Sequence, residues 1–253
     1  MNRIEAACGC SKGKVRANNE DNFYFAGEYL PAENDALPTT LTGAFPPDAA
    51  PCFAVFDGMG GERYGELAAH AAARRMKTLL SRTVWSGRDA AARLEELSLS
   101  LNAAVLEKAR EVLTRHMGST MAGLLFADGS AYAFNLGDSR VYRSRGDSLT
   151  QLSVDHVDSR ALFSRRAKPS LTQHLGIDEE DFVVEPTIVH CQPEPGDCFL
   201  LCSDGLTDML TDAEIGSLLR AGETARDKAE TLIASALDRG GRDNVTVIVC
   251  EVR

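Results

Sequence analysis

The sequence predicts a single α+β domain in which strands and amphipathic helices are mixed along 253 residues. Three observations support this. Short apolar runs bounded by glycine and proline are typical of strands, and longer stretches with apolar residues every three or four positions indicate helices. The composition, 44% hydrophobic and 25% charged, is that of an ordinary globular protein. No internal repeat or linker divides the chain, so we expect one domain over residues 1–253.

The N-terminal part is predicted to hold strands around a long loop. Residues 3–10 form a first strand, and residues 22–25 alternate as a second strand after a polar, acidic cluster. Residues 28–51 contain five of the nine prolines and show no periodicity, which predicts a surface loop. The apolar run 51–56 that follows is rich in Val and Phe and indicates a buried strand.

Two long amphipathic helices are expected over residues 62–82 and 89–116, joined near Trp85-Ser86-Gly87. Their apolar stripes are interpreted as core. The period then changes, with further strands and helices towards the C-terminus. The strands are expected over 118–126, 130–136, 141–143, 148–152, 182–191, 198–203 and 244–252, and the helices over 211–219 and 223–237.

Charge and cysteine usage narrow the functional classes. A net charge of −10 argues against a nucleic-acid-binding face. No apolar stretch approaches the ~20 residues that a membrane span needs, and no signal-peptide core is recognised, so we expect no membrane association and a cytoplasmic protein. The seven cysteines form no C-x-x-C pair and lie mostly in apolar runs, which suits buried thiols in a reducing cytosol. Cys8-Gly-Cys10 is the alternative, a redox or soft-metal site, for which two thiols alone are a poor ligand set.

Asp57 is the first candidate for chemistry. The apolar run 51–56 ends in this carboxylate, and glycines follow at 58, 60 and 61. A carboxylate at the end of a buried strand needs a charged partner or a metal ion, because an isolated buried charge is very costly. Glycine allows the backbone to approach a ligand closely, even with a carbonyl oxygen as a ligand. The alternative is a strand-to-helix turn in which Asp57 is the helix N-cap.

The same chemistry recurs at three more places. Asp204 and a glycine follow the apolar run 198–202, Asp243 precedes the last predicted strand, and Asp138 lies in a turn between strands. Such carboxylates, brought together with Glu20 and Asp21, could not all be ionised without divalent cations. Oxygen ligands without a His or Cys pattern favour Mg²⁺ or Mn²⁺. Two such ions that share a carboxylate are the usual device for displacement at phosphorus.

In this order the motifs resemble the metal-dependent protein serine/threonine phosphatases of the protein phosphatase 2C type, in their compact bacterial form. The resemblance covers about residues 5–252 and implies a four-layer α-β-β-α sandwich of two mostly antiparallel sheets, with the metals at one end. The matching stretches are 16–21 (RANNED), 57–61 (DGMGG), 118–120 (GST), 137–140 (GDSR), 155–156 (DH), 203–206 (SDGL) and 241–244 (GRDN).

The resemblance implies a two-metal centre for Mg²⁺ or Mn²⁺. Asp57 would bridge the two ions, and the carbonyl oxygen of Gly58 would bind one of them. Asp204 and Asp243 would bind the second ion, and Glu20 would contact it directly or through water. The implied reaction is hydrolysis of phosphoserine and phosphothreonine by a water that the two ions activate.

The remaining roles also come from the resemblance. Asp21 would orient the metal-bound water, Arg16 would bind the substrate phosphate, and Asp138 would hold a third, weaker ion. Some relatives have a histidine after the Asp-Gly pair as general acid, where this chain has Met59, so metal-bound water is the expected proton donor. The flap at about 155–176 is shorter than in typical bacterial relatives, which should alter substrate choice first.

Several alternatives remain open from the sequence. The four basic residues within 160–168 would attract an acidic phosphopeptide or simply form a solvated loop. Asp155 and His156 match a turn of the family, and His156 as a general acid is the lesser alternative to a structural histidine. The competing functions are a non-catalytic regulator with this fold and an enzyme for small phosphate esters. If the chain is a protein phosphatase, its partners would be a serine/threonine kinase and the targets of that kinase.

Overall fold

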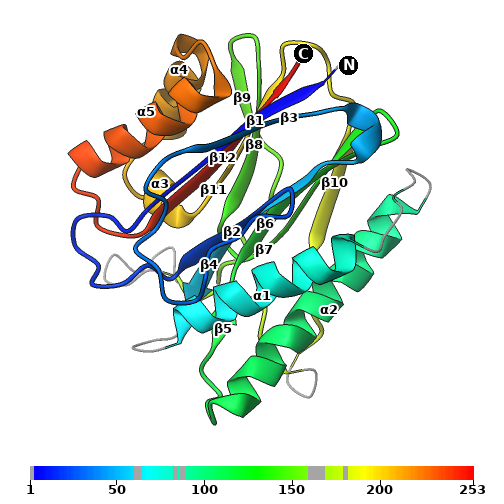
Figure 1. Cartoon of the computed structure of the whole chain (residues 1–253), viewed down its shortest axis with the longest axis vertical. Helices are drawn as coiled ribbons and strands as arrows, with labels where there is room; N and C mark the ends of the chain where they lie inside the picture. Colours follow the sequence, from blue (N-terminus) through cyan, green and yellow to red (C-terminus); the bar gives the residue numbers. More distant parts are fainter. Residues whose placement is uncertain (1–2, 60–63, 82–84, 86–88, 159–168, 179–181) are drawn as a thin grey trace.

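Two antiparallel β-sheets pack face to face, and helices cover both outer faces (Figure 1). The computed structural model describes residues 3–59, 64–81, 85, 89–158, 169–178 and 182–253. In Figure 1 the layers run from the orange helices α4 and α5, through the two sheets, to the cyan and green helices α1 and α2. The predicted four-layer α-β-β-α sandwich is therefore confirmed.

The first sheet is built around the two chain termini. Its central strands β1 and β12 pair along their whole length, with Ile4 opposite Val252, so both ends of the chain lie side by side. The strands of this sheet, in spatial order, are β3 (Leu41–Phe45), β1 (Ile4–Ser11), β12 (Val245–Val252), β11 (Cys198–Cys202), β8 (Arg140–Arg145) and β9 (Ser148–Gln151).

The second sheet carries the first acidic motif. Its register places Asp21, the first residue of β2, directly opposite Asp57 in β4. The short strand β5 (Gly118–Ser119) pairs with the end of β4, at Gly58 and Met59. The other strands, in spatial order, are β10 (Thr187–Cys191), β7 (Ser130–Leu136), β6 (Met121–Ala127), β4 (Cys52–Met59) and β2 (Asp21–Phe25).

The helices form two pairs, one on the outer face of each sheet (Figure 1). α1 (Gly65–Leu80) and α2 (Ala90–Glu111) cover the second sheet, whereas α4 (Asp212–Ala221) and α5 (Ala225–Asp238) cover the first. Capping boxes fix the starts of α4 and α5, because Thr211 and Thr224 each exchange hydrogen bonds with the residue three positions on. The short elements are η1 (Pro47–Ala49) and α3 (Asp204–Thr207).

None of the helices in the described part of the chain has both the length and the apolar character that a bilayer crossing requires.

Three apolar layers hold the sandwich together. One lies between α1, α2 and the second sheet, and one between α4, α5 and the first sheet. The third lies between the sheets and contains Phe23, Phe25, Phe53, Phe126 and Phe199. In that central layer Phe126 of β6 meets Phe199 of β11 edge to face, with ring centroids 5.6 Å apart. Both rings are fully buried, so burial and aromatic geometry stabilise the contact between sheets.

Three expectations need correction. The segment 28–51 is not loop throughout, because residues 41–45 form β3 at the edge of the first sheet. This strand alternates between half-buried and exposed residues over only five positions and contains Gly43. Its pattern was therefore too weak to recognise within a proline-rich segment. The strand expected over 182–191 is confined to β10, and β4 continues past Asp57 to Met59. The first long helix begins at Gly65; the predicted start at 62 and the junction at 86–87 lie outside the described residues.

Phe126→Ala tests the layer between the sheets. Removal of a fully buried ring should lower the free energy of unfolding by about 3–5 kcal/mol. Leu99→Ala is the matched control, because Leu99 lies on α2 with 44% of its surface exposed and should change stability by less than about 0.5 kcal/mol. Urea unfolding followed by circular dichroism measures both, and equal small effects would contradict this account of the core.

Candidate active site

The acidic motifs meet at one end of the sandwich. A cavity of about 330 Å³ lies there, where β4 and β11 end and β8 and β12 begin. All predicted site residues except Asp21 line it, together with three residues of the flap, 169–171. The lining residues are Arg16, Glu20, Asp57, Gly58, Met59, Thr120, Asp138, Pro169, Ser170, Leu171, Asp204 and Asp243.

Asp57 is held on one side by pairing with β2 and on the other side by Thr120. Its amide N–H donates to Thr120 Oγ1 (3.1 Å), and its carbonyl oxygen accepts from the Thr120 N–H (2.8 Å). Asp57 lies inside β4, whereas the N-cap of α1 is Tyr64, so the N-cap interpretation of Asp57 is wrong.

Gly58 could carry no side chain. The Gly58 N–H donates to the carbonyl oxygen of Glu20 (3.2 Å), which ties β4 to the acidic loop. A Cβ atom at Gly58 would lie 2.1 Å from the carbonyl oxygen of Gly65 and 2.6 Å from that of Glu20. The glycine therefore allows the start of α1 and the acidic loop to converge beside Asp57.

Asp21 lies behind the cavity and is fully buried. Its Oδ2 atom accepts hydrogen bonds from the hydroxyls of Ser203 (2.8 Å) and Thr246 (2.7 Å). Burial raises the pKa of Asp21 to about 7; the two hydroxyls lower it, and the negative charges of Asp243 and Glu20 raise it. Because both hydroxyls contact Oδ2, the side chain is fixed in one orientation.

Glu20 and Arg16 come from the loop between β1 and β2. The Arg16 guanidinium donates from Nη2 to Asp243 Oδ2 at 2.6 Å, and this hydrogen bond raises the pKa of Arg16. The amide N–H of Glu20 donates to Asn244 Oδ1 (2.8 Å), and burial raises the pKa of the Glu20 carboxyl. Asn244 also donates to the carbonyl oxygens of Lys12 and Asn18, so its role is to hold this loop against β12.

The donor atoms around the cavity suit hard divalent cations. The lining residues supply carboxylates and the Gly58 carbonyl and include neither His nor Cys, a donor set that favours Mg²⁺ or Mn²⁺. Burial and neighbouring charge raise the pKa of both Asp21 and Glu20, a tension that cations would relieve. In the part of the chain that the structure describes, no group of three acidic, His or Cys side chains is already arranged to hold a metal ion. The acidic side chains instead lie around the cavity, and Arg16 pairs with Asp243. The residues fit the two ions, which would draw them together.

His156 is a structural histidine in this arrangement. Its Nδ1 atom accepts from the Gly137 N–H (3.1 Å), and its Nε2 atom is 2.9 Å from Thr187 Oγ1. Both ring nitrogens are thus engaged, and burial lowers the pKa of the ring. Its neighbour Asp155 pairs with Arg140 at 2.6 Å. The structure therefore favours the structural alternative for both residues, while the basic part of the flap, 160–168, lies outside the described residues.

No cysteine is among the residues that line the cavity. All seven are free, and burial raises the pKa of both Cys8 and Cys10. The Cys10 thiol packs against Asn19 and the Thr246 hydroxyl rather than against a second thiol. This favours the interpretation as buried thiols over a redox or soft-metal site.

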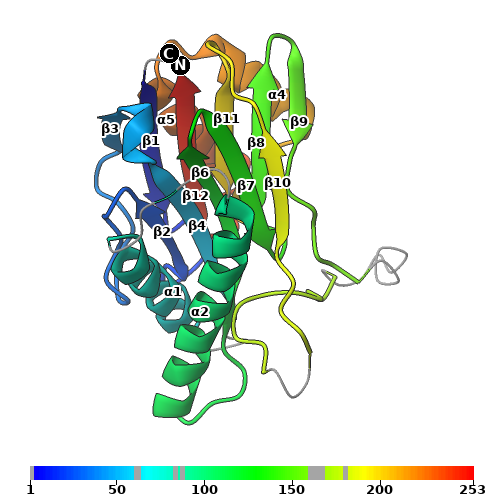
Figure 2. The same ribbon diagram turned by 90° about the vertical axis from the view of Figure 1, so that its right-hand side faces the viewer.

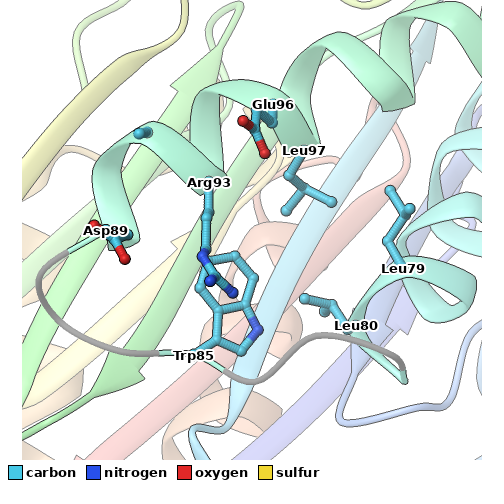
Figure 3. Close-up of a pocket in the computed structure, with 8 residues that line it drawn as sticks. Leu79, Leu80, Trp85, Asp89, Arg93, Glu96 and Leu97 are labelled. Carbon is cyan, nitrogen blue, oxygen red and sulfur yellow. The ribbon is translucent and has the colours of Figure 1, made fainter.

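A larger cavity at the far end of the helical layer does not share this chemistry. It measures about 500 Å³ and lies between the C-terminal end of α1 and the N-terminal half of α2 (Figure 3). Figure 3 shows Trp85 and the side chain of Arg93 beside each other, with Leu79, Leu80 and Leu97 around them. Its lining lacks the gathered carboxylates of the strand ends, so size alone does not identify the site.

Sequence reasoning missed Ser203 and Thr246 as supports of Asp21. Each lies next to an apolar run, Ser203 after β11 and Thr246 within β12, and both are fully buried. A polar residue at an inward position of an apolar strand is a usable signal, because such a group needs a hydrogen-bonding partner.

Fold and cavity together define a metal-dependent enzyme that acts on phosphate esters, and comparisons with known proteins specify it further. The family model described as "Protein phosphatase 2C" matches residues 41–238. The chain belongs to the protein phosphatase 2C family, the metal-dependent serine/threonine phosphatases that its motifs resemble. The chain is thus a metal-dependent serine/threonine phosphatase.

Three relatives illustrate the similarity. The serine/threonine phosphatase stp of Listeria innocua is 30% identical over 262 residues, which cover 95% of this chain and 92% of that protein. The structure of PppA, described as a key regulatory component of T6SS in Pseudomonas aeruginosa, superposes with a TM-score of 0.80 at 27% identity and full coverage of both chains. The catalytic domain of the phosphatase PstP in complex with two manganese ions gives a TM-score of 0.78 at 32% identity, covering 99% of this chain and 100% of that one.

Thr246→Val tests the support of Asp21. The substitution keeps shape but removes the hydroxyl that holds Oδ2, so the rate of phosphate release should fall about 10- to 100-fold with the fold intact. Thr246→Ser keeps the hydroxyl and should retain most of the activity. Steady-state assays of both variants measure this, and a Thr246→Val enzyme as active as Thr246→Ser would refute the role of the hydroxyl.

Asp21→Asn tests the pH dependence of stability without metal. The folded pKa of Asp21, about 7, exceeds the unfolded value, so protonation stabilises the folded state at low pH and that contribution is lost as pH rises from about 4 to about 7. In EDTA, Asp21→Asn should therefore be more stable than the parent at pH 8, by a few kcal/mol at most, and by less at pH 5. Urea unfolding at both pH values checks this, with exposed Asp147→Asn as control; a gain independent of pH would contradict it.

Proposed function

We propose that residues 1–253 form one catalytic domain that removes phosphate from phosphoserine and phosphothreonine of proteins with two Mg²⁺ or Mn²⁺ ions. The observation that carries this is the gathering of strand-end carboxylates and one arginine around a single cavity. The names of the relatives, serine/threonine phosphatases, support the substrate class, and the two manganese ions of PstP support the metal number.

In this proposal the strand ends hold the ions. Asp57, near the end of β4, would be the carboxylate shared by both ions, the Gly58 carbonyl would hold one ion, and Asp204 and Asp243 would hold the other with Glu20 beside them. Asp138, in the turn before β8, provides for a weaker third ion. When bound, such ions polarise phosphate oxygens and lower the pKa of water.

The protein's own groups bind and orient. Arg16 has an exposed, long side chain whose donors engage the nearest anion, Asp243 here and the phosphate of the substrate during turnover. Asp21 has Oδ2 occupied by two hydroxyls, which leaves Oδ1 to accept a hydrogen bond from the attacking water. Among the described residues no histidine lines the cavity, so water in the site would give the leaving alcohol its proton.

The kinase partner and the cellular compartment belong to the same proposal. Substrates would include a serine/threonine kinase and its targets, which an assay on the autophosphorylated kinase from the same cells tests; retention of its phosphate would count against the kinase as substrate. A reducing compartment, the cytoplasm, suits seven free cysteines, nearly all of them buried. Fractionation of the cells decides this, and recovery outside the cytoplasm would overturn it.

Asp57→Asn tests the metal centre. Phosphate release from a phosphothreonine peptide should require MnCl₂, stop in EDTA and return with added Mn²⁺. Asp57→Asn should lose more than about 100-fold in rate, beyond the range for residues that only support a ligand. Exposed Asp147→Asn is the control and should behave as the parent protein.

The alternatives predict different outcomes in the same assay. A non-catalytic regulator would bind partners without turnover in any metal. An enzyme for small phosphate esters would hydrolyse para-nitrophenyl phosphate but leave phosphopeptides intact. Metal binding in calorimetry that survives Asp57→Asn unchanged would contradict the assigned ligand.

A further inference from the structure

The cavity has two chemically different sides. The carboxylates at the strand ends form the acidic side of the cavity. Met59 and the last part of the flap form the other side. We name residues 169–177 the return segment; its first three residues, Pro169, Ser170 and Leu171, line the cavity. Figure 2 shows this yellow-green segment passing beside the green helix α2.

The front of the return segment, residues 169–172, is held by backbone hydrogen bonds. Val157 and Leu171 form a β-bridge, the Asp158 N–H donates to Ser170 (3.0 Å), and the Thr172 N–H donates to His156 (2.8 Å). These partners belong to the flap side of the cavity. His156 itself bonds to Gly137 and to Thr187 of β10, so the front is tied to the second sheet there, and the other end of the segment supplies its second anchor.

The rear of the return segment is fixed to the core by Asn102. This residue lies on α2 with only 1% of its surface exposed. Its Oδ1 accepts from the N–H groups of Gly176 (2.7 Å) and Ile177 (3.0 Å), and its Nδ2 donates to the Ile177 carbonyl (2.9 Å). Leu175 also exchanges two backbone bonds with Ser119 of β5.

Gly176 shows how closely the segment packs at this anchor. Its φ angle of +97° suits glycine, and a Cβ atom there would lie 2.4 Å from the Met117 carbonyl oxygen. Because Gly176 packs this closely against the Met117 backbone, it cannot shift without moving the neighbouring residues of the return segment. Only five positions separate Gly176 from Leu171, so a shift at Asn102 is passed to the cavity wall.

We propose that Asn102 is a positioning residue for protein substrates: it fixes the return segment so that Pro169–Leu171 form the wall that receives the polypeptide around the phosphorylated residue. The inference rests on the proposed function. A phosphate group needs the acidic side with its cations and Arg16, whereas the flanking polypeptide needs a shaped wall. Loss of the anchor should therefore affect phosphopeptides far more than small phosphate esters.

The experiment compares two substrates on matched variants with saturating Mn²⁺. Asn102→Ala should lower kcat/KM for a phosphothreonine peptide about tenfold, mainly through KM, and change kcat/KM for para-nitrophenyl phosphate less than about threefold. Ser98→Ala is the control, because Ser98 is buried one turn earlier on α2 and bonds only within its helix, to the Leu94 carbonyl (2.7 Å). It should leave both substrates unaffected.

A second variant covers a fold defect. Asn102→Asp keeps the acceptor for Gly176 and Ile177 but loses the donor to the Ile177 carbonyl, and it should show the same selective loss if Asn102→Ala is not folded in thermal melts. Equal losses for both substrates, or none for the peptide, would overturn the inference. A parent enzyme inactive on both substrates would instead defeat the proposed function, so the two failures are distinguishable.

Discussion

The pairing of Asp21 with Asp57 across β2 and β4 is the constraint on which the site depends. Two carboxylates opposite each other in an antiparallel pair repel, and burial of Asp21 increases that cost. A strand register shifted by one residue would turn them to opposite faces and remove the repulsion. The sandwich instead keeps the register, because Asp21 and Asp57 lie on the same faces of their strands as Phe23, Val55 and Phe53, which are buried between the sheets.

The two sheets contribute to this pair jointly. Asp21 belongs to the second sheet, yet its hydroxyl partner Thr246 lies in β12 of the first sheet, and Ser203 follows β11 of that sheet. The link runs across the interface that Phe126 and Phe199 fill further along. The packing between the sheets therefore determines the orientation of the Asp21 carboxylate. A shift of one sheet over the other would break the hydrogen bonds to Asp21 Oδ2.

The sequence predicted the parts of the site that have a local signal. Asp57, Asp204 and Asp243 each stand beside glycine or asparagine at the end of an apolar run, and the structure brings all three to one cavity. Thr246 and Asn102 had no such signal, because their partners lie more than seventy residues away in the chain. The edge strand β3 was missed for a different reason, since its burial on one face is only partial.

The architecture separates catalysis from substrate choice. The acidic side is built from strands inside two sheets, where every neighbouring strand restrains it, and its geometry tolerates little change. The wall is a connecting segment held by backbone bonds to residues 156–158 and to Ser119, and by the side chains of Asn102 and Gln173. Single substitutions can remove restraints of this kind. We therefore expect a chain of this fold to change its protein substrates through the wall and its anchor, while the metal ligands stay fixed.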